Sequence, residues 1–77
     1  MTDFYAKCAD FAKKQVEWSN HEIKWLTEQM HFEKDYYGYK TDWYKKCENR
    51  RNREYRDRKK NEMAVEKYSR MAERSCR

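Results

Sequence analysis

The stretch "YGYKTD" (residues 37–42) contains the only glycine of a 77-residue chain that has no proline. Glycine readily adopts the left-handed conformation that ends many helices, so Gly38 predicts a helix C-terminus. Thr41 and Asp42 are typical of a helix N-terminus, because their side-chain oxygens can accept hydrogen bonds from backbone N–H groups. We therefore expect a short turn here, and it divides the chain into two segments of similar length.

The segment before the turn has the repeat of one long amphipathic helix over about residues 3–37. Two apolar rows recur at seven-residue spacing, and charged side chains fill the opposite side of the helical wheel. Ser19 and Glu22 resemble a capping box, but the repeat keeps its phase there, so we expect no break. The first row is aromatic: Phe4, Phe11, Trp18, Trp25 and Phe32. The second row is mostly aliphatic: Ala9, Val16, Ile23, Met30 and Tyr37.

The segment after the turn predicts a second helix, over about residues 42–75, because it contains neither glycine nor proline. Two long helices joined by a short turn form an antiparallel αα-hairpin, in which residue i faces roughly residue 78 − i. This pairing sets apolar residues opposite each other at both ends and polar residues opposite each other in the middle. We predict an all-α fold: a single helical-hairpin domain over residues 1–77, with the turn at 38–41.

The middle of the hairpin is expected to hold a structural polar layer. Glu22 lies on the inner side of the first helix, and the pairing places Arg51 and Arg58 on the inner side of the second, together with Arg50. We expect Glu22 to form an ion pair with Arg51 or Arg58, and the Trp rings to offer cation–π contacts to the arginines.

The apolar face of the first helix spans roughly 155°, which is wider than the seam of two helices can cover. Two explanations remain open. The surplus can be core, if the hairpin self-associates as a dimer into a four-helix bundle. Alternatively, the aromatic row, above all Trp18 and Trp25, docks on another protein.

A basic ridge follows the outer face of the second helix. The net charge of +5 is concentrated in the stretch "NRRNREYRDRKK" (residues 49–60), but on a helix this stretch divides between the inner face and a longer line. Such a line can be a solvated face, a contact for nucleic-acid phosphates or a contact for an acidic protein. The basic members of the line are Lys46, Arg53, Arg56, Lys60, Lys67, Arg70, Arg74 and Arg77.

The sequence lacks the motifs of catalysis and of metal binding. It has no Gly-rich phosphate loop, nucleophile elbow or HExxH pattern. His21 and His31 are about 15 Å apart along a helix, too far to share one metal ion. We therefore expect no enzyme activity, cofactor, metal or small-molecule substrate. An odd number of cysteines (Cys8, Cys47 and Cys76) without a CxxC pair favours free thiols in the cytoplasm.

These features favour a non-enzymatic interaction protein that regulates or inhibits a macromolecular partner. The aromatic row is the expected contact with a protein partner. The alternative is an RNA- or DNA-binding protein that uses the basic ridge and is tolerant of sequence, since no base-reading motif is present. No apolar run is long enough for a membrane span, and no membrane contact is expected. The compact, proline-free, aromatic and charged composition is typical of small phage or mobile-element accessory proteins.

Overall fold

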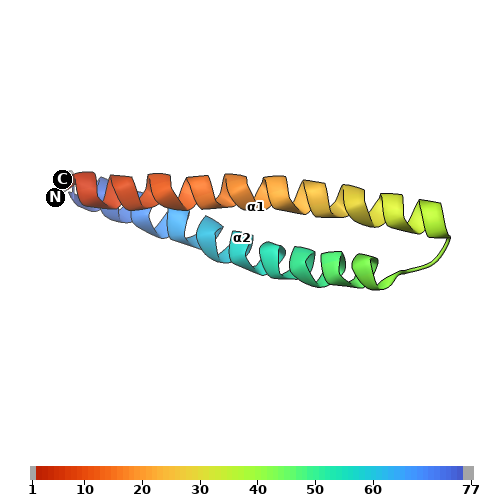
Figure 1. Ribbon diagram of the computed structural model, residues 1–77. Helices are drawn as coiled ribbons and strands as arrows, with labels where there is room; N and C mark the ends of the chain where they lie inside the picture. The colour runs from red at the N-terminus through yellow and green to blue at the C-terminus, as the bar shows by residue number, and fades with distance from the viewer. Residues whose placement is uncertain (1, 76–77) are drawn as a thin grey trace.

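The protein is a hairpin of two long helices (Figure 1). The computed structural model describes the backbone of residues 2–75 and the side chains of residues 4–74. Helix α1 covers Thr2–Tyr37 and helix α2 covers Asp42–Ser75. The helices run antiparallel, so the start of α1 and the end of α2 lie together, and the Cα trace measures 59 × 14 × 11 Å. The predicted all-α hairpin is therefore confirmed, and α1 continues without a break past Ser19.

The turn is fixed by one residue that ends α1 and one that begins α2. Gly38 has a φ of 77°, and its N–H donates a hydrogen bond to the carbonyl oxygen of Lys34 (2.7 Å), as in a left-handed C-cap. The Thr41 hydroxyl accepts a hydrogen bond from the Tyr44 N–H (3.2 Å), which caps α2. The same hydroxyl donates to Glu33 Oε1 (2.9 Å), so the start of α2 is tied to α1.

A single seam between the helices forms the core. On α1 the seam consists of the aliphatic row up to Met30 and a neighbouring row that includes small residues. Tyr37, the last member of the aliphatic row, is 50% exposed and lies outside the seam. Near the turn, Tyr44 packs against the most deeply buried cluster, which contains Leu26, Met30 and Cys47. At the other end, Tyr5 stacks on Tyr68 with ring centroids 6.5 Å apart. The residues that are only 2–8% exposed are Ala9, Ala12, Ser19, Ile23, Leu26, Met30 and Cys47.

Polar contacts join the two helices in the middle of the hairpin. Arg58 Nη1 donates a hydrogen bond to Asn20 Oδ1 (3.0 Å), and Arg51 Nη1 donates to Thr27 Oγ1 (3.3 Å). Both contacts join residues that the pairing expected from sequence sets opposite each other. These polar contacts therefore agree with the expected register of the hairpin, and apolar side chains pack on either side of them.

Candidate protein-binding face

The aromatic row lies beside the seam and is exposed. Its five side chains, Phe4, Phe11, Trp18, Trp25 and Phe32, are 47–65% exposed. Ring contacts are made along α1 itself: Phe4 meets Tyr5 edge-on, with centroids 5.5 Å apart, and Phe32 stacks on Tyr36 at 6.1 Å. The aromatic row is about 130° around α1 from the centre of the seam, so α2 cannot cover both at once.

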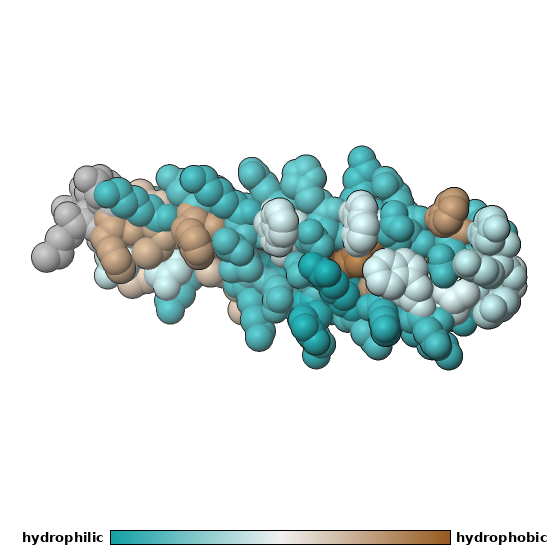
Figure 2. Space-filling model, viewed as in Figure 1, coloured by the Kyte–Doolittle hydropathy of each residue, from teal (hydrophilic) through white to brown (hydrophobic). Residues whose placement is uncertain are grey.

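Two shallow hollows separate the aromatic row from α2. The first, of about 570 Å³, is lined largely by apolar residues that include Phe4, Phe11, Ala64 and Tyr68. The second, of about 380 Å³, lies in the middle of the hairpin, and its lining residues include Trp18, Glu54, Asp57 and Lys60. Figure 2 shows a matching difference, with apolar side chains toward the end where α1 begins and α2 ends and mostly hydrophilic ones in the middle.

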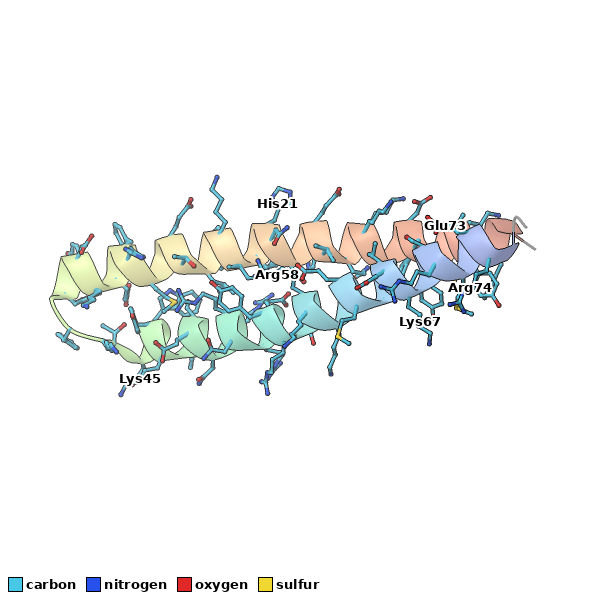
Figure 3. All side chains as sticks on the ribbon, turned by 180° about the vertical axis from the view of Figure 1, so that it is seen from behind. His21, Lys45, Arg58, Lys67, Glu73 and Arg74 are labelled. Carbon is cyan, nitrogen blue, oxygen red and sulfur yellow. The ribbon has the colours of Figure 1, made fainter. Side chains whose placement is uncertain are left out.

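The polar layer has a different set of partners from the one expected. Glu22 Oε2 pairs with Arg50 Nη2 at 3.3 Å, not with Arg51 or Arg58. The guanidinium groups of Arg51 and Arg58 lie 5.9 and 5.1 Å from the centre of the Tyr55 ring, so a tyrosine of α2 takes the cation–π role expected for the Trp rings. Figure 3 shows Arg58 between the two helices. The polar layer is therefore formed by contacts between residues of a single hairpin.

The basic ridge is an exposed surface of α2. Figure 3 shows Lys67 projecting from α2 on the side away from α1. Arg70 forms an ion pair with Glu66, one turn away on the same helix. Lys60 lines the same hollow as Trp18, so part of the ridge borders the aromatic side of the molecule. Arg77 lies outside the described residues. The exposed members of the ridge are Lys46, Arg53, Arg56, Lys60, Lys67, Arg70 and Arg74.

The cysteines and histidines do not form a site. Cys47 is buried in the seam, and burial raises the pKa of its thiol, with a further rise from Glu33 and an opposing effect of Arg50. Cys8 is half-buried and is also a free thiol, while Cys76 lies outside the described residues. Within residues 4–74, no group of three His, Cys, Asp or Glu side chains is placed to hold a metal ion. Over the same part of the chain, neither helix is long and apolar enough to cross a membrane.

Comparison with known proteins finds no match: no protein-family model, no curated protein and no solved structure matches this chain. No site residue is therefore assigned by likeness to a relative.

Proposed function

We propose that this chain is a non-enzymatic interaction protein that binds another protein through the aromatic row on α1 and thereby regulates or inhibits it. The observation that carries this proposal is the exposure of all five aromatic side chains along one line of a helix. Exposed apolar surface with a polar rim is typical of protein-binding sites. Tryptophan, in particular, is enriched among the residues that dominate interface energies.

The shape of the hairpin supports binding in preference to catalysis. Its Cα trace, 14 by 11 Å across, accommodates one seam between two helices. The hollows beside the aromatic row are open to solvent, whereas small substrates are mostly held in concave pockets that bury most of their surface. A long, narrow surface is better suited to a macromolecule that contacts it along its length.

The chemistry of the face favours a partner that presents an amphipathic helix. Aromatic side chains at seven-residue spacing are matched by apolar side chains with the same repeat on a facing helix. The apolar hollow beside Phe4 and Phe11 offers room for large aliphatic side chains of that helix. Near Trp18, Glu54 and Asp57 offer carboxylates to basic residues on its edge.

The aromatic row is tested by substituting Trp18→Ala together with Trp25→Ala in the full chain. Both rings are exposed, so we expect the hairpin to keep its far-UV circular dichroism while the variant no longer retains a partner from an extract of the native host. Mass spectrometry of the retained proteins gives the readout. The matched control is Lys46→Glu with Lys67→Glu, two exposed ridge residues that line neither hollow, and we expect it to retain the same partner. Equal retention by the tryptophan variant would contradict the proposal.

A second candidate function, contact with RNA or DNA, is favoured by the position of Lys60. Proteins that bind single strands combine basic side chains for the phosphates with aromatic rings for base stacking. Lys60 and Trp18 line one hollow, although Glu54 and Asp57 in that hollow oppose phosphate binding. If this candidate holds, binding is insensitive to base sequence and falls steeply with salt. Retention would then be lost on nuclease treatment and in the lysine variant.

We also propose a reducing, cytoplasmic setting. Cys8 and Cys47 are free thiols, and Cys47 is buried in the seam. A free thiol is the stable form of cysteine where the cell keeps its proteins reduced. Mass spectrometry of the protein alkylated inside intact host cells should find these cysteines modified as thiols after unfolding. Recovery of mixed disulfides from those cells would contradict the setting.

A further inference from the structure

The aromatic row is symmetric about its central residue, Trp18. Phe11 and Trp25 lie one seven-residue step on either side of it, and Phe4 and Phe32 lie two steps on either side. A row with matching side chains at equal distances from its centre fits itself when a second copy lies antiparallel across a twofold axis. Phe4 of one copy then meets Phe32 of the other, and the two Trp18 rings meet at the axis.

Charges along the outer edge of the aromatic row favour the same arrangement. This edge is formed by the adjacent row of α1, which is basic in its first half and acidic in its second half. In an antiparallel pair, Lys7 of one copy lies nearly level with Glu28 of the other, and the axis repeats this contact. A parallel pair would set this row against the inner edge of the other copy and not against its own counterpart, so the contact between Lys7 and Glu28 would be lost. The five exposed residues of the edge are Lys7, Lys14, His21, Glu28 and Asp35.

The inner edge of the aromatic row is compatible with the antiparallel arrangement. Here Glu22 is the charged residue, and its carboxylate already pairs with Arg50 across the hairpin. An antiparallel copy brings Gln15 nearly level with Glu22, so an amide meets the carboxylate.

The exposed area of the aromatic row is sufficient for a dimer contact. An aromatic side chain buries about 150–250 Å² when it is fully covered. At the exposed fractions of 47–65%, the five rings offer about 450–750 Å² per copy. A stable interface buries about 800 Å² per partner, so the rings supply most of it and the two edges supply the remainder.

The basic ridge indicates that the contact is made by α1 and that the four helices do not close into a bundle. Lys60 borders Trp18 across the hairpin, so it lies near the same level as the axis. Arg53 and Lys67 are one seven-residue step on either side of Lys60. If α2 also packed against its own copy, Arg53 would face Lys67 and Lys60 would face itself, and the ridges would repel each other.

We propose that two copies of this chain associate through the aromatic rows of their α1 helices, antiparallel, with Trp18 at the twofold axis and Lys7 of each copy paired with Glu28 of the other. This inference rests on the proposed function in one respect: the partner protein and the second copy use the same row. Binding of the partner therefore displaces the second copy, and self-association keeps the rings covered until the partner is present.

Charge exchange at the two paired positions tests the arrangement. The full-length protein and its Lys7→Glu, Glu28→Lys and doubly substituted variants are compared by sedimentation equilibrium, with circular dichroism to confirm the helical content. We expect a dimer for the wild type, and a dimer weakened about tenfold in each single variant. We expect the double variant to regain the wild-type affinity. Residues 7 and 28 are about 32 Å apart on α1, so a contact within one copy cannot produce this rescue.

Two further variants test whether the dimer contact is confined to the aromatic row. Lys24→Glu, an exposed change of the same kind away from the aromatic row, should leave the dimer unchanged. Trp18→Glu should abolish the dimer and preserve the helices, because the ring is 58% exposed in the single hairpin. A monomeric wild type, single charge variants that dimerise normally, or a double variant without rescue would each overturn the proposal. Partner capture is measured separately, so loss of the dimer contact and failure of the proposed function are distinguished.

Discussion

Two rows of the same helix, with the same spacing and nearly the same length, have opposite environments in this protein. The aliphatic row, which contains Ala9, Ile23 and Met30, is covered by α2, whereas the aromatic row remains exposed from Phe4 to Phe32. Both are apolar, so hydrophobicity alone does not decide which row faces the second helix. The difference is in the size and shape of the side chains.

Small side chains explain why α2 packs where it does. Ala12 and Ser19 lie in the buried row next to the aliphatic one, and they let the two backbones approach closely. A seam centred on Trp18 and Trp25 would hold the helices farther apart and leave gaps between the rings. A two-helix hairpin can therefore cover the smaller apolar rows well, and the aromatic rings are left for another molecule.

The largest expected effect is a loss of stability when a buried residue of the seam is shortened. Leu26 is 2% exposed within the cluster near the turn, so Leu26→Ala removes buried contacts and leaves a cavity. We expect the free energy of unfolding to fall by about 2–5 kcal/mol, measured by urea denaturation. The matched control is Phe11→Ala, which should change it by less than about 0.5 kcal/mol at concentrations where the chain is monomeric. A larger loss from Phe11→Ala would contradict the division between the rows.

Enlarging a small residue of the seam should give an intermediate effect. Ala9 is buried in the seam between α1 and α2, and Ala9→Leu introduces three carbon atoms into that space. We expect a loss of about 1–3 kcal/mol of unfolding free energy from overpacking. The same change at Ala6, which is exposed on α1, serves as the control and should be nearly neutral. A stabilised Ala9→Leu variant would show that helix approach does not select the row.

The smallest expected effect is on the pH dependence of stability, and it comes from the buried thiol of Cys47. Burial raises the pKa of Cys47, so the folded state disfavours the thiolate. Stability from this group is complete below the unfolded thiol pKa of about 8.5 and is lost as the pH rises through the higher folded value. The Cys47→Ala variant has no thiol to ionise at this position. Its unfolding free energy should therefore fall less steeply than that of the wild type between about pH 8 and pH 10. Parallel pH profiles for the two proteins would contradict the expectation.

Much of the fold could be predicted from the sequence because its signals are local. The seven-residue repeat predicts α1, and the absence of glycine and proline after the turn predicts α2. Gly38 and Thr41 each supply a cap whose hydrogen bonds involve residues nearby in the chain or across the turn. A local signal needs no knowledge of how the two helices are rotated relative to each other.

The contacts across the seam could not be predicted in the same way. Glu22 pairs with Arg50 and not with Arg51, and adjacent residues on a helix differ by about 100° in direction. A small rotation of α2 therefore changes the partner. The pairing of residue i with 78 − i sets Lys60 level with Trp18, but only the rotation of α2 places both residues around one hollow. The approach of the basic ridge to the aromatic side could therefore not be predicted from the pairing alone.

The polar contacts in the middle of the hairpin also have a consequence for how uniquely it assembles. Helices with a strict repeat can slide past each other by one repeat and restore most of their packing, which creates competing alignments. Here Asn20 and Thr27, the partners of Arg58 and Arg51, are flanked one step away by Lys13 and Lys34. A slip in one direction brings Arg58 against Lys13, and a slip in the other brings Arg51 against Lys34. Misaligned hairpins are therefore penalised by repulsion in both directions, and one alignment is selected.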